Sequence, residues 1–255
     1  MLTTRNRKYG WKPSLPDHRD HIAQYHLNRA TPLPNKIDLT PMFPQVWDQG
    51  NLGACTSFGL GAAVAYLLTK QGLKMFRPSN LFIYWNERNI EGTVNQDSGA
   101  MIRDGVKVLN KLGAPNQFYW PYDISKFTQK PPQVAFQNAL KTIVTEYLSV
   151  DNTNLAAIQA PLAQKLPVVI GISVYESFES DQVAKTGIVP MPKKNEKLLG
   201  GHCVVLTGYN NSTQRFNGRN SWSEQWGDKG NFTIPYNYIL NPNLCDDAWV
   251  LEMET

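Results

Sequence analysis

Cysteine is scarce in this chain, with three residues, Cys55, Cys203 and Cys245, among 255. So small and odd a set argues against a disulfide framework and leaves at least one thiol free. The chain also lacks an apolar run long enough to cross a bilayer, and its first eleven residues carry charge without the apolar stretch of a secretory signal. We therefore expect a soluble protein that does not enter a membrane, and an intracellular setting.

An excess of one charge is also missing from most of the chain. Lys and Arg total 25 against 21 for Asp and Glu, but Arg5, Arg7, Lys8 and Lys12 account for that difference. The remaining chain is balanced, so the composition does not favour a nucleic-acid partner. A hydrophobic content of 42% is sufficient for a large core, and we expect a monomer with one large domain or two packed halves.

Residues 1–32 differ in composition from the rest of the chain and form an expected N-terminal extension. They are rich in proline, histidine and charge, without a sustained helical or strand period. Aromatic residues such as Tyr9 and Trp11 indicate an extended segment pinned to a folded body. Residues 1–31 could regulate a cleft, as in a zymogen, although termini are more often plain structural straps. The unevenly spaced His18, His21 and His26 make a poor metal site, so we expect no metal.

The remainder, residues 33–255, reads as helices and then strands. An apolar helix is expected from Cys55 to about Lys70, a second after Ser79, and a third that Ser98 caps. Strands are expected near 142–150, 167–174, 203–209, 230–234 and 248–253. This order predicts an α+β fold with a helical half at about 45–140, a β half at about 141–255, and a cleft between them.

Cys55 is the first candidate for chemistry because it begins the apolar helix. The positive end of the helix macrodipole stabilises a thiolate there. His202 comes after two glycines at the start of a strand and could supply a base, although a lone histidine is more often structural. Asn220 precedes a segment with two tryptophans, which by itself indicates a turn with aromatic packing.

Together these motifs resemble the papain family of cysteine peptidases. The resemblance is carried by Gln49-Gly-Asn-Leu-Gly-Ala-Cys55, by Gly-His202 with the strand after it, and by Arg-Asn220-Ser-Trp222. His202 lies 147 residues after Cys55, inside the spacing typical of the family, and Asn220 lies 165 after it. One departure is Leu52, which stands where relatives have a cysteine, so their usual disulfide at this loop cannot form.

The resemblance implies a two-subdomain fold, with a mainly helical half and an antiparallel, barrel-like β half, and a cysteine endopeptidase without metal or cofactor. Cys55 would attack a peptide carbonyl, His202 would form an ion pair with it, Asn220 would orient the imidazole, and Gln49 would stabilise the oxyanion. Trp222 would shield the Asn220 contact. The residues expected to bind a protein or peptide substrate, with a preference for bulky apolar side chains, are Ser98, Gly99, Gly171, Cys203 and Trp222.

Two other functions remain open at this point. A related amidohydrolase or acyltransferase could use the same residues on another acyl donor. A non-catalytic binding homologue could keep the fold, but it predicts a broken set of catalytic residues, whereas Gln49, Cys55, His202 and Asn220 are all present.

Overall fold

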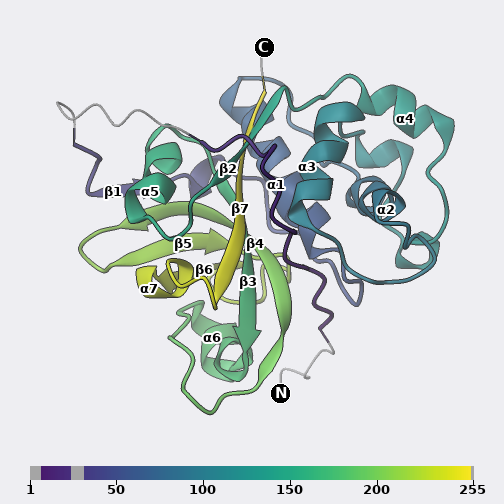
Figure 1. Cartoon of the computed structure of the whole chain (residues 1–255). Helices are drawn as coiled ribbons and strands as arrows, with labels where there is room; N and C mark the ends of the chain where they lie inside the picture. The colour runs from purple at the N-terminus through teal and green to yellow at the C-terminus, as the bar shows by residue number, and fades with distance from the viewer. Residues whose placement is uncertain (1–6, 24–31, 254–255) are drawn as a thin grey trace.

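The computed structural model describes residues 7–23 and 32–253 and has a helical side and a sheet side (Figure 1). The helices are α1 (Cys55–Lys70), α2 (Asn80–Ile90), α3 (Ile102–Lys111), α4 (Gln133–Ala139), α5 (Leu155–Ala163), α6 (Asp181–Thr186) and α7 (Tyr236–Ile239). The strands are β1 (Lys36–Asp38), β2 (Glu146–Val150), β3 (Val168–Tyr175), β4 (Leu198–Asn210), β5 (Arg215–Arg219), β6 (Asn231–Pro235) and β7 (Cys245–Glu252). The predicted α+β fold class is confirmed.

Helix α1 runs through the middle of the molecule because it is apolar on nearly every side. All residues from Cys55 to Leu68 are buried, and the helix contacts α2, α3 and strand β4. A helix of this kind has no solvent face and must be surrounded by other elements. Its first residue, Cys55, is thereby fixed at the junction of the two halves.

The predicted cap of the third helix is wrong. Helix α3 begins at Ile102, and its N-cap residue is Met101, which makes no side-chain capping bond. The hydroxyl oxygen of Ser98 instead lies within hydrogen-bond distance of Thr93 Oγ1, at 2.9 Å, and of the Gly99 carbonyl, at 3.0 Å. Gly99 has a φ of 68°, a left-handed conformation that favours glycine and keeps the chain out of the helix at this point.

The sheet is antiparallel throughout, with the order β2-β7-β3-β4-β5-β6, and β1 pairs with β4 outside this path. The longest strand, β4, packs directly on α1. A Cβ on Gly59 of α1 would come within 2.9 Å of the Cys203 sulfur, which shows how close the two elements are. This packing brings the start of α1 beside His202 and Cys203 of β4.

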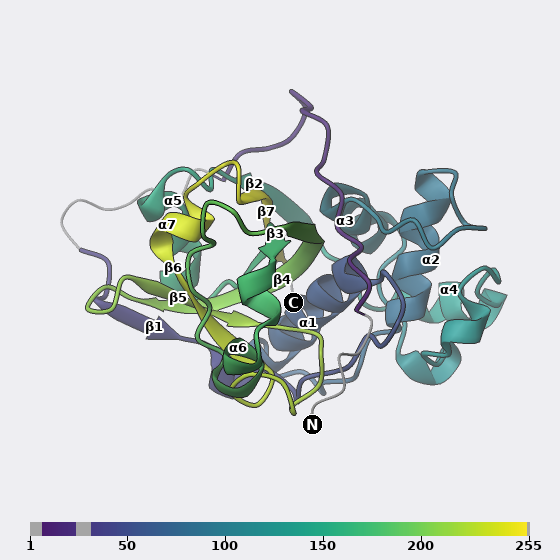
Figure 2. The same cartoon turned by 90° about the horizontal axis from the view of Figure 1, so that it is seen from below.

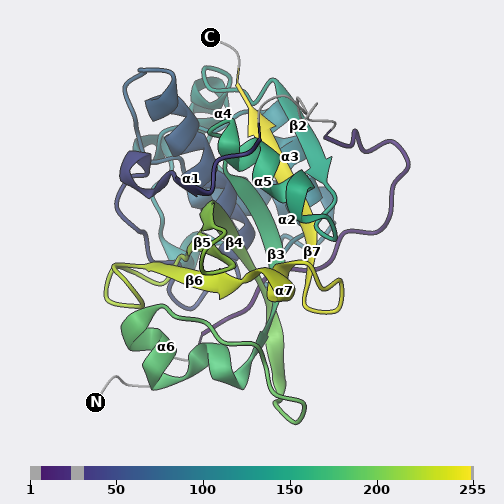
Figure 3. The same cartoon turned by 90° about the vertical axis from the view of Figure 1, so that its left-hand side faces the viewer.

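An extended segment, residues 7–23, crosses the junction of the two halves and is called the strap below. Figures 1 and 2 show it in dark purple, passing α1 between the helical side and the sheet. Further along, His21 and Ala23 exchange backbone hydrogen bonds with Ser149 of the edge strand β2. Figure 3 shows the two ends of the described chain on opposite sides of the molecule. In the described ranges, no helix is both long and apolar enough to cross a membrane.

Candidate active site

Cys55 is the first residue of α1 and lies beneath the strap. Ala54, the residue before it, provides no side-chain cap, so the first N–H groups of the helix are available to other acceptors. Backbone N–H groups of Cys203 and Gly10 hydrogen-bond to the thiol and lower its pKa, but its complete burial outweighs them and raises the pKa to about 12. The covered thiol is therefore uncharged near neutral pH, in contrast to the thiolate that the helix start alone predicts.

His202 precedes Cys203 in β4, the residue whose backbone N–H hydrogen-bonds to the Cys55 thiol. Its Nε2 lies 2.8 Å from Asn220 Oδ1, which also accepts from the Ser221 N–H at 2.8 Å. An amide oxygen accepts, so Nε2 carries the proton and Nδ1 is the basic nitrogen. Nδ1 is buried and has no partner among the described residues. Burial lowers the pKa of His202 to about 4, so the covered imidazole is also neutral.

Trp222 covers the contact between His202 and Asn220. Its ring stacks on the imidazole with centroids 4.7 Å apart, and only 1% of the residue is exposed. Asn220 itself comes directly after β5, and its N–H donates to the Gly230 carbonyl at 3.0 Å. A hydrogen bond shielded from water in this way is stronger and better oriented than an exposed one.

The segment from Asp48 to Ala54 is called the oxyanion loop below, and Gln49 is at its centre. Gln49 Nε2 donates to the Leu52 carbonyl at 2.9 Å, and its Oε1 accepts from the Ser221 hydroxyl at 2.6 Å. The Gly53 N–H donates to Asp97 at 3.0 Å, and the Tyr122 hydroxyl donates to the Gln49 carbonyl at 2.8 Å. Buried hydrogen bonds hold this loop where relatives are expected to have a disulfide.

The strap lies over these groups. Gln49 Nε2 also donates to the carbonyl of Lys8 at 3.3 Å. A Cβ on Gly10 would lie 1.8 Å from the Gly53 carbonyl, so only glycine allows the strap to approach the oxyanion loop this closely. The strap therefore covers Cys55 and accepts a hydrogen bond from the Gln49 amide, the group expected to stabilise an oxyanion.

The predicted substrate-binding residues come from two places: Gly171 of β3 and Cys203 of β4 are partners in the sheet, and Ser98 and Gly99 lie before α3. Gly99 and Gly171 contact the strap: added Cβ atoms would come within 2.2 Å of the Gly10 carbonyl and 2.0 Å of the Trp11 ring. The Ser98 side chain is engaged with Thr93 and its own neighbour. The Cys203 sulfur lies against Gly59 of α1.

Sequence reasoning missed several residues of the site. Gly201 and Asp247 contact the side chain of Trp11, which was expected only to pin the segment to the body, and Ser221 anchors Gln49. The adjacent Gly10 and Trp11 are the sequence feature that could have indicated a close approach of the strap.

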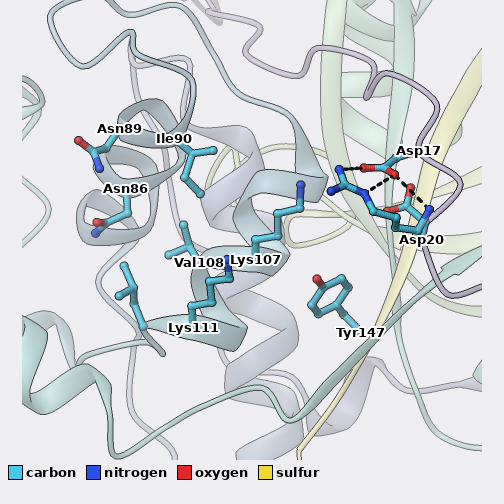
Figure 4. A pocket seen from close by; sticks show the side chains of 11 residues that line it. Asp17, Asp20, Asn86, Asn89, Ile90, Lys107, Val108, Lys111 and Tyr147 are labelled. Carbon is cyan, nitrogen blue, oxygen red and sulfur yellow. Dashed lines mark hydrogen bonds and ion pairs between the residues drawn. The ribbon is translucent and has the colours of Figure 1, made fainter.

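A separate cavity of about 550 Å³ lies between the strap and the helical half (Figure 4). Lys107 and Lys111 of α3 line one side, Tyr147 of β2 lies opposite, and Asp17 and Asp20 of the strap lie nearby. The cavity contains none of the residues expected to catalyse or to bind substrate. It is not part of the candidate active site.

The site combines a thiol at the start of a helix, an imidazole oriented by an amide, and a loop with a side-chain amide, and it lies between a helical half and a β half. This arrangement is typical of hydrolases that use a cysteine thiol. The family model described as papain family cysteine protease matches residues 33–248, so the chain belongs to that family and is a cysteine-type peptidase.

Individual relatives agree with this assignment. Over its full length the chain is similar to the crystal structure of xylellain, a cysteine protease from Xylella fastidiosa, with 39% identity, complete coverage of both chains and a TM-score of 0.91. An uncharacterized peptidase C1-like protein of Acanthamoeba polyphaga mimivirus is 36% identical, over 99% of this chain and 89% of the viral protein. Digestive procathepsin L 3 of Tenebrio molitor shares the fold at 17% identity, with 97% and 76% of the two chains covered and a TM-score of 0.72.

Proposed function

We propose that the chain is an endopeptidase in which Cys55, His202 and Asn220 carry out the reaction and Gln49 stabilises the oxyanion. The observation that carries this proposal is the contact of His202 Nε2 with Asn220 Oδ1 at 2.8 Å, which leaves Nδ1 unpartnered within the described chain. A general base needs this arrangement: one ring nitrogen oriented by a partner and the other free to take a proton.

In the proposed reaction, Nδ1 of His202 takes the Cys55 proton and the thiolate attacks the peptide carbonyl carbon. The resulting oxyanion accepts hydrogen bonds from Gln49 Nε2 and the Cys55 backbone N–H. His202 then protonates the leaving amine as the carbon–nitrogen bond breaks, giving a thioester. Water, deprotonated by the same imidazole, attacks the thioester and releases the acid and the thiol.

Cleavage within a chain, rather than at its end, is supported by the path of the strap. The strap has residues on both sides of the thiol: Tyr9 packs edge-on to His202, and Trp11 pairs with Ala100. A cleft that holds an extended segment of this kind has room for an internal stretch of a substrate chain.

The same path supports regulation by residues 1–31, of which the structure describes 7–23. The strap uses a Gln49 donor, contacts the Cys55 thiol through Gly10 N–H, and keeps the thiol and the imidazole buried. Peptide hydrolysis then requires that the strap move out of the cleft. In this proposal, residues 1–32 are an extension of a peptidase domain at 33–255 and hold it in a zymogen-like state.

Active-site labelling tests the nucleophile. A peptidyl epoxysuccinyl compound should add once, at Cys55, to the full chain carrying Trp11→Ala, which loosens the strap over the thiol, as read by mass spectrometry of peptide fragments. Cys55→Ala should abolish both the adduct and the hydrolysis of a peptide substrate. Cys245→Ala is the matched control, because this cysteine is equally buried but lies in β7. An adduct that persists in Cys55→Ala would rule out this nucleophile.

A further inference from the structure

Cys203 of β4 lies against the start of α1, beside Cys55. Its backbone N–H hydrogen-bonds to the Cys55 sulfur. Its own sulfur lies on Gly59, one helical turn further along α1, where an added Cβ would come within 2.9 Å of it. Residues four apart in a helix lie on the same face, so the Cys203 sulfur packs on the face of α1 that also carries Cys55.

The packing of α1 on β4 places the two thiols within reach of a covalent bond. A disulfide joins residues whose Cα atoms are about 4 to 7 Å apart. A backbone that already hydrogen-bonds to the partner's sulfur is at this short range, and rotation about the Cα–Cβ bond of Cys203 carries its sulfur from Gly59 toward Cys55. Both residues are free thiols. The third free thiol, Cys245, is in β7, and β3 separates that strand from β4. Cys203 is therefore the thiol placed to react with Cys55.

The strap lies over this pair of cysteines. The Gly10 N–H hydrogen-bonds to the Cys55 sulfur, and the Trp11 ring packs on Gly171, which pairs with Cys203 in the sheet. Burial raises the pKa of Cys55, and displacement of the strap relieves this burial and admits small solutes to the sulfur. A thiolate at the start of a helix is the form of cysteine that a peroxide oxidises.

We propose that hydrogen peroxide converts Cys55 and Cys203 into a reversible disulfide when the strap is displaced, and that Cys203 thereby protects the nucleophile from irreversible oxidation. In the first step the Cys55 thiolate attacks one peroxide oxygen, the O–O bond breaks, and hydroxide leaves as Cys55 becomes a sulfenic acid. In the second step the Cys203 sulfur attacks the Cys55 sulfur, the S–O bond breaks, and the hydroxyl leaves with the Cys203 proton as water. Two electrons pass in total from the two thiols to the peroxide.

The disulfide stops peptide hydrolysis because it contains the nucleophile, and it holds the sulfur at a level of oxidation that thiols reverse. A sulfenic acid without a neighbouring thiol is oxidised further to a sulfinic acid, which thiols do not reduce. The inference rests on the proposed function, since it uses the same Cys55 thiolate that attacks a peptide.

Peroxide treatment of the full chain carrying Trp11→Ala, the parent protein below, tests the inference. A small molar excess of hydrogen peroxide should stop hydrolysis of a fluorogenic peptide, and dithiothreitol should restore most of the rate. The intact mass should fall by about 2 Da, and a peptide map without reductant should join the Cys55 and Cys203 peptides. The chain with Trp11 unchanged should be oxidised about tenfold more slowly, because the strap covers the thiol.

Two cysteine variants of the parent protein separate the partner of Cys55 from a general thiol effect. With the same peroxide, Cys203→Ala should gain about 32 Da, as the sulfinic acid of Cys55, and dithiothreitol should restore less than about a tenth of its own starting rate. Cys245→Ala is the matched control and should recover as the parent does, because this cysteine is equally buried but lies in β7. Each recovery is compared with the variant's own starting rate, so any effect of Cys203→Ala on hydrolysis itself does not enter.

A parent protein that reaches the sulfinic acid while Cys203 can still be alkylated, or equal recovery of the parent and Cys203→Ala, would overturn the role of Cys203. The peptide map of the parent decides this even if Cys203→Ala does not fold. Equally fast oxidation with Trp11 unchanged would overturn the protection by the strap. Failure of the proposed function looks different, because hydrolysis and labelling of Cys55 are then absent before any peroxide is added.

Discussion

The strap and the oxyanion loop meet over Cys55, yet they are attached to the protein in opposite ways. In the oxyanion loop, Gln49 and Leu52 are buried and joined to each other, and Gln49 is bound to Ser221 from the other half. The strap has one buried large side chain, Trp11, while Lys8 and Lys12 pair through partly exposed ammonium groups with the largely buried carboxylates of Asp97 and Glu91. The difference indicates a loop that belongs to the core and a strap whose contacts water or a substrate can replace.

The largest expected effect comes from placing a charge inside the oxyanion loop. Leu52 is 2% exposed, so Leu52→Asp buries a carboxylate without a partner, and we expect the free energy of unfolding to fall by about 4 kcal/mol with most activity lost. Urea unfolding and peptide hydrolysis measure the two effects. Leu52→Met, which keeps the volume and apolar character, should cost about 1 kcal/mol or less. Full activity in Leu52→Asp would show that the loop does not depend on this packing.

Removing the Gln49 amide should reduce catalysis more than folding. We expect Gln49→Ala to lower kcat by about 10²- to 10³-fold, because an oxyanion donor acts mainly in the transition state, with a smaller change in KM. Steady-state kinetics separate the two constants, and Gln225→Ala, on an exposed residue, is the control. A loss confined to KM would place Gln49 in substrate binding instead.

Loosening the strap should raise the rate of peptide hydrolysis, whereas the two substitutions in the oxyanion loop should lower it. Trp11→Ala removes the buried anchor of the strap. If this changes the free-energy difference between the covered and the open state of the cleft by about 1.4 kcal/mol, the ratio of open to covered molecules changes tenfold. We therefore expect peptide hydrolysis to rise about tenfold. Because burial raises the pKa of Cys55, uncovering should also move thiol alkylation to lower pH.

The control for the strap is Leu15→Ala, since Leu15 lies in the strap but is 73% exposed and packs on little. It should leave hydrolysis within about twofold of the unchanged protein. If Trp11→Ala gives the same rate and the same alkylation profile as the unchanged protein, the strap is a structural element and does not restrain the enzyme.

The contrast between the two segments also marks what the sequence could predict. The oxyanion loop is local to α1, the order of helices and strands predicts the fold class, and the motifs around Cys55, His202 and Asn220 carry the family resemblance, so short motifs contain this information. The path of the strap depends on contacts with residues far away in the chain, such as Trp11 with Gly171 and Asp247, and no local period indicates them. The predicted cap at Ser98 is wrong for a related reason, because a left-handed Gly99 decides where α3 begins.

The smallest effect is expected from the ion pair that joins the two segments. Asp97 accepts from the Gly53 N–H of the loop at 3.0 Å and from Lys8 of the strap at 2.7 Å. The Lys8 side chain is 55% exposed, so the pair contributes about 0.5 kcal/mol, and Lys8→Gln should raise hydrolysis by about twofold.

Salt separates this electrostatic contribution from the packing of Trp11. The gain from Lys8→Gln should vanish in about 1 M salt, where the screening length is about 3 Å, while the gain from Trp11→Ala should persist. Lys74→Gln, an exposed lysine outside the strap, is the control for net charge. A gain from Lys8→Gln that equals the gain from Trp11→Ala and survives salt would mean that the strap is anchored at the oxyanion loop rather than through Trp11.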